Sequence, residues 1–374
     1  MPKNILFIGP YRQTDGWGGA AKDYVLSLGK TSHNVACRPI YMAPSIEKEI
    51  DQVLVDMENN YFDSQPDIIV QNVLPSLIDY QPNCKNIALF DLETHNLKHT
   101  GWPYKINLAD EAWVSTIYEK TALEDSGVMI PIKVVGTPID TSKLTSELSP
   151  MDIPEADGKY LFYFIGEYIS RKYIQALLVA FHREFHFSEQ VALFIKTSKG
   201  GFSEQQLFDA VQDECTKLKN NMRLYAEIDS YHEELVATSR FTDDEMIQLH
   251  KRGDCFVMPS HGESLCRPVQ DAMFIGSDII VTENAGMDEL IANGSKWKVN
   301  SVRGTPIIAD APMKYLYTSH ETWANLELTS LQKAMREAFE SNSESRQERA
   351  AINKQHLLDN FSHEASAKKF EEIL

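Results

Sequence analysis

The sequence lacks any cysteine pair with the spacing of a redox or zinc motif. Because no CxxC pair is present, the cysteines predict neither a disulfide framework nor a zinc site, and we expect no bound metal. An odd number of scattered cysteines is typical of a reduced, cytoplasmic protein. The five cysteines are Cys37, Cys84, Cys215, Cys255 and Cys266.

Long apolar runs and an excess of positive charge are also missing. No stretch approaches the ~18 apolar residues of a transmembrane helix. The apolar residues near the start, 5–8, end at Gly9 and are too few for a signal peptide. The chain has 36 Lys and Arg against 54 Asp and Glu, a formal net charge of -18. This balance argues against a broad cationic nucleic-acid surface, although a local basic groove remains compatible with it.

Apolar residues make up 43% of the 374 residues, enough for two or three domains or one large α/β body. Short apolar segments alternate with helical ones, which predicts parallel sheets in two successive α/β units. A segment rich in Ser, Pro and acidic residues, 141–159, separates the two units. Strands are expected at 4–8, 34–39, 67–71, 86–90, 111–115 and 133–140, and then at 160–165, 191–196, 222–228 and 255–258, with a helix at 241–252.

Paired glycines, Gly18 and Gly19, are predicted to precede the first helix. Glycines at a helix start allow the backbone to approach a phosphate or a sugar closely. The GxGxxG spacing is absent, so an ordinary dinucleotide-binding fold is not supported. A simple tight turn accounts for the two glycines equally well.

The loop after the expected strand at 86–90 is polar and aromatic. Ligands of open α/β sheets bind at the carboxyl ends of parallel strands, so Glu93, His95 and His99 are candidate site residues. The alternative is that these are ordinary surface side chains.

The stretch 254–289 predicts a strand, a loop, a helix and a second strand. Pro268 suits the first turn of that helix, and Gly276 suits its end. Glu263 then lies on the loop, and Asp271 lies one turn into the helix. Carboxylates accept hydrogen bonds from sugar or ribose hydroxyls, while free amides at a helix start bind anions. The alternative is a capped helix with surface acids.

Cations follow the strand expected at 160–165, just as Glu263 follows the strand expected at 255–258. Arg171 and Lys172 stand at the beginning of an amphipathic helix, and Lys196 ends the strand at 191–196. Two such cations suit a diphosphate. Positive charge is unfavourable against the dipole at a helix start, which favours a functional reason for it.

Taken in order, these blocks resemble the retaining glycosyltransferases of family 4 (glycosyl transferases group 1), which have the GT-B fold. That family has a glutamate, seven residues and a second acid before Ala-Met and a glycine, matched here by Glu263, Asp271, Ala272-Met273 and Gly276. The second acid is usually glutamate. The resemblance implies two Rossmann-like parallel-sheet domains facing a central cleft: 1–155 on the acceptor side, 156–345 for the donor, and 346–374 as a helix crossing back.

The resemblance also implies a function: transfer of a sugar from a nucleotide-diphosphate sugar to a hydroxyl acceptor, with no cofactor beyond this co-substrate and no metal. Glu263 would contact the sugar and Asp271 the ribose, while His95 would position the sugar. The remaining donor contacts would be the diphosphate contacts Arg171, Lys172, Lys196, Ser264 and Leu265, together with Gly18 and Gly19.

The acceptor and the reaction type stay open. An epimerase or phosphorylase of the same fold, or a non-catalytic nucleotide-sugar-binding protein, would share these blocks. The run from Gly262 to Pro268 resembles glycosyltransferases of bacteriophages, so the acceptor could be hydroxymethylated DNA as well as a glycan or small molecule. Arg12 and His99 are acceptor-side hints for DNA, and the acidic net charge weighs against it. The sequence does not predict the oligomeric state.

Overall fold

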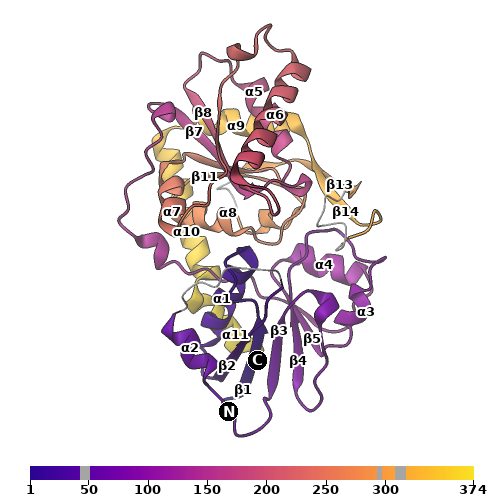
Figure 1. The fold of residues 1–374 in the computed structure, drawn as a ribbon. Coiled ribbons are helices and arrows are strands. Elements are labelled where there is room, and N and C mark those ends of the chain that lie inside the picture. The colour runs from indigo at the N-terminus through magenta and orange to yellow at the C-terminus, as the bar shows by residue number, and fades with distance from the viewer. Residues whose placement is uncertain (43–50, 293–296, 308–316) are drawn as a thin grey trace. The chain divides into compact units, whose positions relative to one another are not determined.

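The computed structural model describes residues 1–42, 51–292, 297–307 and 317–374, which form two compact units (Figure 1). Unit 1 comprises Met1–Thr141 and Leu357–Leu374, and unit 2 comprises Ser142–His356. The sequence had placed the two boundaries after residues 155 and 345.

The segment after Ser142 packs on helix α7 (Asp243–Arg252) of unit 2. The Lys251 ammonium donates to the carbonyls of Ser146 and Leu148 at 2.5 and 3.0 Å. The Met151 amide donates to the Gln248 carbonyl at 2.9 Å. Because these bonds tie the segment to unit 2, the first boundary lies after Thr141, before the predicted boundary after residue 155.

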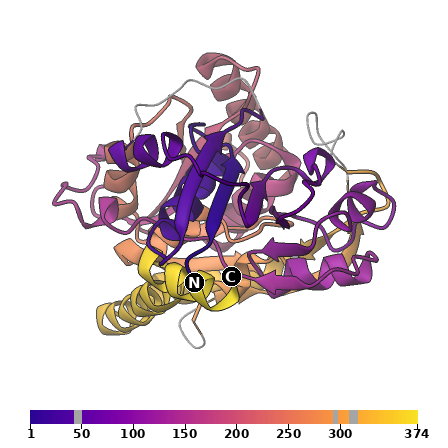
Figure 2. The same ribbon diagram turned by 90° about the horizontal axis from the view of Figure 1, so that it is seen from below.

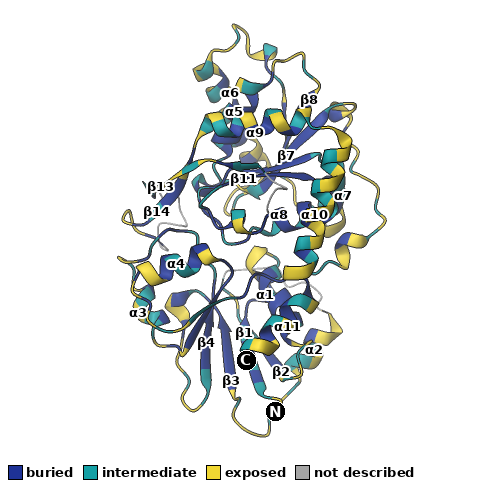
Figure 3. Cartoon of the chain, turned by 180° about the vertical axis from the view of Figure 1, so that it is seen from behind, coloured by how far each residue is buried: buried dark blue, intermediate teal, exposed yellow. Residues whose placement is uncertain are grey.

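Unit 1 is built on a six-stranded parallel sheet of order β2-β1-β3-β4-β5-β6. Its central strands are buried over nearly their whole length, as expected where helices cover both faces (Figure 3). The strands are β1 (Asn4–Gly9), β2 (Asn34–Pro39), β3 (Ile68–Asn72), β4 (Lys85–Leu89), β5 (Glu111–Val114) and β6 (Ile132–Val134).

The last helix of the chain completes the core of unit 1. Phe370 stacks on Trp113 with ring centroids 5.4 Å apart, and both rings are fully buried. Ser362 caps this helix, since its hydroxyl accepts from the Ala365 amide. The Lys3 ammonium donates to the Leu374 carbonyl, so the two chain ends lie side by side (Figure 2). The helices of unit 1 are α1 (Gly16–Leu28), α2 (Gln52–Glu58), α3 (Trp102–Ile106), α4 (Ile117–Asp125) and α11 (His363–Ile373).

Unit 2 contains a second six-stranded parallel sheet, of order β12-β11-β10-β7-β8-β9, and an antiparallel hairpin, β13–β14. The two parallel α/β sheets confirm the predicted fold class. The strands are β7 (Tyr160–Glu167), β8 (Val191–Ser198), β9 (Glu234–Ala237), β10 (Cys255–Met258), β11 (Asp278–Thr282), β12 (Trp297–Val299), β13 (Ser301–Pro306) and β14 (Thr322–Leu326). The helices, besides α7, are α5 (Ile174–Glu184), α6 (Glu204–Met222), α8 (Arg267–Ile275), α9 (Leu328–Glu340) and α10 (Ser343–Phe361), the last of which runs from unit 2 into unit 1.

The strand predicted at 222–228 is wrong. Helix α6 continues to Met222, and Arg223 then adopts a left-handed conformation with φ 53° that ends it. The third strand in sequence is instead β9, which begins at the charged Glu234. An edge strand that starts with a buried ion pair has no simple apolar pattern, and the sequence reading therefore missed it.

The strand orders define one topological switch point in each sheet. In unit 1, β1 lies between β2 and β3, and in unit 2, β7 lies between β10 and β8. A switch point lies between two neighbouring strands from which successive connections run toward opposite edges of the sheet. It falls between β1 and β3 in unit 1 and between β7 and β10 in unit 2. Ligands of open α/β sheets bind at the carboxyl ends of the strands at such points.

We expect the ion-pair cluster at β9 to make unit 2 sensitive to acid. Glu234 is buried and pairs with His182 of α5 and with the Lys219 ammonium of α6 at 2.6 Å. Burial alone would raise the pKa of Glu234, but His182 and Lys219 outweigh it and leave the pKa below the ordinary 4.5. The charged carboxylate therefore stabilises the fold above about pH 4.5 and loses this effect as the pH falls through the depressed pKa.

The test is chemical denaturation of Glu234→Gln between pH 7 and pH 3. The variant should be less stable than wild type at pH 7 and should lose less of its remaining stability in acid. Glu233→Gln, at the exposed neighbouring position, is the matched control. Equal acid dependence in Glu234→Gln and wild type would contradict the assignment.

Candidate functional site

A buried ion cluster lies at the switch point of unit 2, on the loops that follow β7 and β10. Glu263 is 5% exposed. Its Oε1 accepts from Arg171 Nη1 at 2.5 Å, from Lys172 Nζ at 2.7 Å and from the Ser260 hydroxyl at 2.8 Å. Among the described residues, its Oε2 accepts no hydrogen bond from another side chain. One carboxylate oxygen is thus fixed by two cations and a hydroxyl, and the second is not bonded to any described side chain.

The charges of the cluster keep Glu263 ionised. Burial raises the pKa of this carboxyl, but the nearby Arg171 and Lys172 cations lower it more, so the net pKa lies below the ordinary value. The structure therefore brings together three residues that the sequence had singled out separately. It pairs the carboxylate directly with both cations, which the sequence reading had assigned to the diphosphate alone.

Arg171 holds the loop that carries Glu263. Its Nη1 also donates to the Gly262 carbonyl at 2.6 Å. In return, the carbonyl of Arg171 accepts from the His261 amide at 2.8 Å and from the Ser260 hydroxyl at 3.0 Å. With Arg171 buried to this extent, Lys172 is the more accessible of the two cations.

The loop after β11 supports Glu263 from the other side. The Glu263 amide donates to the Ala285 carbonyl at 2.8 Å. A side chain on Gly286 would meet the Glu263 carbonyl at 2.1 Å, and Gly286 has φ 84°, so only glycine fits there. The sequence reading did not select Gly286, although a glycine after a buried strand is the signal that would have found it.

Three stacked rings flank the same loop. The His261 ring lies on Tyr173, with centroids 4.1 Å apart, and faces Trp323 of β14 in parallel at 5.5 Å. His261 is also bonded to Ala324 of β14. Its ring Nδ1 lies 2.6 Å from the Ala324 carbonyl oxygen, and its own carbonyl accepts from the Ala324 amide at 3.0 Å. The hairpin thereby braces the loop of Glu263. No local pattern signals contacts made across about sixty residues.

Helix α8 starts directly after this loop, as predicted. Gly276 caps its end with φ 109°. Ser264 is half-buried and Leu265 is buried ahead of the helix, and Asp271 is half-buried in its second turn. The proposed contacts of these three residues with the diphosphate and ribose stay predictions.

Lys196 lies at the carboxyl end of β8, next to β7 in the sheet. Its ammonium is buried and sits 5.0 Å from the centre of the Phe241 ring. Burial lowers the pKa of Lys196. An ammonium group that lies over an aromatic face and is largely shielded from solvent binds few water molecules. Little water would therefore have to be displaced when an anion approaches it.

The prediction that Gly18 and Gly19 precede the first helix is wrong, because α1 begins at Gly16 with Asp15 as its cap. The Gly18 amide donates to the Asp15 carboxylate at 2.8 Å, and the Gly19 amide donates to the Asp15 carbonyl at 3.0 Å. A side chain on Gly18 would meet the Gln13 carbonyl at 2.1 Å. The physical reason for this glycine is close packing of the turn.

The loop after β4 carries the acceptor-side candidates of unit 1. His95 is buried with its ring edge against Tyr118 at 5.5 Å, whereas Glu93 is half-buried and His99 is exposed. Glu119 of α4 anchors this loop, since its carboxylate accepts from the amides of Leu92, Ser115 and Thr116 at 2.8 to 2.9 Å.

Arg12 is engaged by α2. Its guanidinium bonds to the Glu58 carboxylate through Nε at 2.8 Å and through Nη2 at 2.5 Å, and the Tyr11 hydroxyl joins them at 3.0 Å. The Arg12 bond is the foremost reason that the pKa of Glu58 is lowered. A guanidinium held in this fork stabilises the turn after β1.

Within the described ranges, no group of three or more His, Cys, Asp or Glu side chains is arranged to hold a metal ion. In the same part of the chain, no helix is long and apolar enough to cross a membrane.

One known protein family matches the part of the chain that contains this site. Residues 147–302 match the family described as glycosyl transferases group 1. This range contains the Glu263 cluster, α8 and Lys196. No match is found among curated proteins.

Solved structures resemble the whole chain at low identity. HepE of Anabaena, in complex with UDP-glucose, is 13% identical, with 99% of each chain covered and a TM-score of 0.64. The N-terminal domain of Candida albicans trehalose-6-phosphate phosphatase is 12% identical over 100% of this chain and 97% of that one, with a TM-score of 0.67. A trehalose-6-phosphate structure from E. coli, bound with UDP-2-fluoro glucose, is 10% identical over 99% and 98%, with a TM-score of 0.66. The chain therefore has the GT-B fold, and the group 1 match supports a glycosyltransferase.

Proposed function

We propose that the protein is a metal-independent glycosyltransferase that moves a sugar from a nucleoside-diphosphate sugar to a hydroxyl, with retention of the anomeric configuration. The observation that carries this proposal is the Glu263–Lys172–Arg171 cluster at the switch point of unit 2. It supports the proposal because a carboxylate, which can accept from hydroxyls, lies beside fixed positive charge, which suits a diphosphate. HepE and the E. coli structure were solved with UDP-glucose and UDP-2-fluoro glucose, which makes UDP-sugars the first donors to test.

In the proposed reaction, the bond between the sugar and the diphosphate breaks, and a new bond forms to the acceptor oxygen. The acceptor proton passes to the leaving diphosphate oxygen on the same face, so no protein base is required. Negative charge grows on the diphosphate, and Lys172 stabilises it while Arg171 keeps the loop in place. Preorganised charge of this kind is usually the largest catalytic contribution.

The donor site is completed in this proposal by residues around the cluster. Asp271 accepts from the ribose, Ser264 and Leu265 offer amides, and Lys196 adds a second cation. The proposal also assigns His95 to positioning of the transferred sugar and Gly18 and Gly19 to donor binding. Arg12, Glu93 and His99 belong to the acceptor side.

The decisive experiment is a donor screen. Purified protein is incubated with UDP-, GDP- and ADP-sugars, with and without hydroxyl acceptors, and release of nucleoside diphosphate is measured. Lys172→Ala should lower release about a hundredfold, because the leaving diphosphate loses a preorganised cation. Lys333→Ala, at a position 77% exposed, is the matched control and should behave as wild type.

The outcomes also separate the rival functions. Conversion of the donor to an isomer without an acceptor would indicate an epimerase, and dependence on inorganic phosphate would indicate a phosphorylase. Binding of nucleoside diphosphate without turnover would indicate a binding protein. Failure to bind any of the donors, or equal release from Lys172→Ala and wild type, would overturn the proposal.

A further inference from the structure

Tyr173 has an uncommon backbone conformation at the junction of two helical segments. It follows the 3₁₀ turn η4 (Ser170–Lys172) and directly precedes α5, with φ 50° and ψ 46°. This left-handed region is unfavourable for a bulky side chain, whereas glycine adopts it readily. Other contacts must therefore hold Tyr173 in place. Strain of this kind is found where the surrounding structure fixes the geometry of a site.

The ring of Tyr173 belongs to a stack that contains a second unfavourable feature. It lies on the His261 ring with centroids 4.1 Å apart and planes 23° from parallel, and the Trp323 ring is parallel to the His261 ring within 6°. Trp323 is 3% exposed, and among the described residues its indole N–H has no hydrogen-bond acceptor. A buried donor without a partner is unfavourable. Trp323 thus contributes through its ring face, and the two unfavourable features meet at His261.

The His261 ring is itself fixed in orientation. Its Nδ1 lies 2.6 Å from the Ala324 carbonyl oxygen, which can only accept, so Nδ1 carries the proton. Burial lowers the pKa of His261, and the ring is therefore neutral at neutral pH. A neutral ring adds no third positive charge to the two cations of the cluster. It cannot turn without breaking its bond to Ala324, so it offers Tyr173 a fixed surface.

Both sequence neighbours of Lys172 are attached to His261. The Arg171 carbonyl accepts from the His261 amide at 2.8 Å, and the Tyr173 ring lies on the His261 ring. Lys172 stands between these two attachments, and Glu263 follows His261 by two residues. The backbone of Lys172 therefore cannot shift against the loop of Glu263 without breaking one of them. The 2.7 Å contact between the Lys172 ammonium and Glu263 Oε1 depends on this arrangement.

We propose that Tyr173 and His261 are positioning residues of the donor site. Their stacked rings keep Lys172 at a fixed distance from Glu263, with Trp323 as the support of the stack. This inference rests on the proposed glycosyltransferase function and deepens it by naming residues that act through Lys172. Because Lys172 acts on charge that grows during transfer, its displacement lowers kcat rather than donor affinity.

The test separates the ring of Tyr173 from the strain in its backbone. Tyr173→Gly removes the ring and relieves the strain, whereas Tyr173→Phe keeps both. With a donor that the wild type cleaves, Tyr173→Gly should lower kcat about tenfold and change the donor KM by less than about twofold. Tyr173→Phe should retain the wild-type kcat. His261→Ala removes the surface under the ring and should lower kcat as Tyr173→Gly does.

A double variant tests whether the ring acts through Lys172. Residues that act as one unit are not additive, so adding Tyr173→Gly to Lys172→Ala should lower the remaining kcat by less than about twofold. A further loss of about tenfold in the double variant would show that the ring acts elsewhere and would overturn the inference.

Two matched controls lie outside the cluster. Arg223→Gly relieves the same kind of strain, because Arg223 is an exposed residue with φ 53° at the end of α6. Phe187→Ala removes a ring that is 52% exposed and lies 4.2 Å from the His186 ring in the loop before β8. Both variants should keep the wild-type kcat and KM.

A crystal structure of Tyr173→Gly gives a readout that needs no turnover. The distance from Lys172 Nζ to Glu263 Oε1 should lengthen by about 1 Å, a displacement large enough to impair catalysis. Tyr173→Phe should keep the wild-type distance. Tyr173→Asn also tolerates the left-handed region and lacks the ring, so it replaces Tyr173→Gly if glycine impairs folding.

Three outcomes would overturn the inference. They are an unchanged distance in the folded ringless variant, a wild-type kcat in that variant, and loss of folding in both Tyr173→Gly and Tyr173→Asn, which would make the ring purely structural. Failure of the wild type to bind or cleave any donor would instead count against the proposed function. The distance measurement would then still decide whether the rings position the ion pair.

Discussion

Replacing Glu263 with glutamine is expected to lower sugar transfer at least about a hundredfold, with the main effect on kcat. The carboxylate positions Lys172 and Arg171 through one oxygen, and in the proposed function its second oxygen accepts from a ligand hydroxyl. Glutamine keeps the shape but removes the charge, so two cations in a buried site lose their shared partner. Leaving buried charge unpaired is strongly unfavourable, and the cations are then expected to shift out of position.

Steady-state kinetics with the donor found in the screen measures this effect. Glu263→Asp retains the charge with a shorter reach and should be intermediate, while Glu147→Gln, an exposed carboxylate of the same unit, should match wild type. Because the pKa of Glu263 is lowered, its charge should persist as the pH falls through the ordinary range of glutamate. Activity of Glu263→Gln within a few fold of wild type would show that the cluster is not the reaction site.

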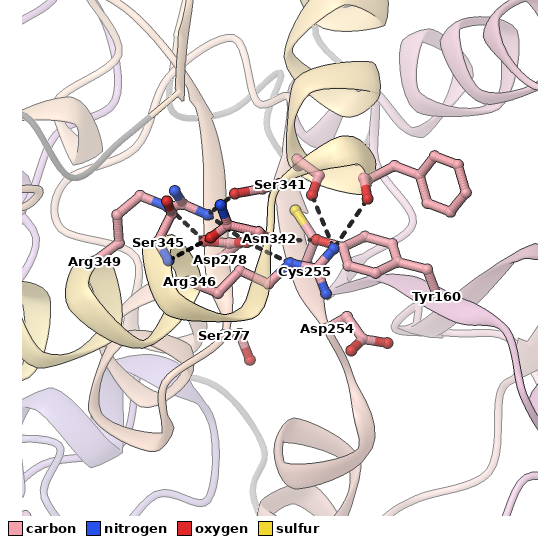
Figure 4. A network of polar contacts seen from close by, with 12 residues as sticks. Tyr160, Asp254, Cys255, Ser277, Asp278, Ser341, Asn342, Ser345, Arg346 and Arg349 are labelled. Carbon is pink, nitrogen blue, oxygen red and sulfur yellow. Dashed lines mark hydrogen bonds and ion pairs between the residues drawn. The ribbon is translucent and has the colours of Figure 1, made fainter.

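Replacing Asp278 with alanine is expected to destabilise unit 2 by about 3 kcal/mol, the cost of leaving one side of a buried ion pair unpaired. Asp278 is buried at the start of β11. Its two oxygens accept from Arg349 of α10 at 2.9 and 3.1 Å, and Arg346 approaches at 3.8 Å (Figure 4). The network fixes α10 to the sheet, and Tyr160 lies within 3.5 Å of the same carboxylate.

Chemical denaturation at neutral pH measures the loss, and a double-mutant cycle with Arg349→Ala isolates the coupling of the pair. Asp213→Ala is the matched control. It removes a carboxylate that Lys217 approaches at 2.6 Å, but both side chains are 63% exposed, so little change is expected. Equal loss in the two aspartate variants would mean that the buried geometry of Asp278 adds nothing.

Most of the architecture could be predicted because it depends on local patterns. Buried apolar runs bounded by Gly, Pro and polar residues gave β1 to β5, β7, β8 and β10 within about two residues, a margin typical of such boundaries. Gly276 marked the end of α8 through its own backbone chemistry. The strand predicted at 133–140 is too long, because β6 ends at Val134. The missed β9 and the start of α1 depend on an ion pair and a capping carboxylate that no periodicity reveals.

The sequence by itself determined which residues are candidates for the donor site. Arg171 and Lys172 were singled out because positive charge at a predicted helix start is unfavourable against the dipole, and Glu263 because its carboxylate precedes a helix start and can accept from hydroxyls. Only the tertiary structure decided that these residues meet, since β7 and β10 are neighbours in the sheet although about ninety residues separate their loops. The stacking of Trp323 on His261 likewise depends on strand order, which arises from the packing of distant segments and leaves no trace in local sequence.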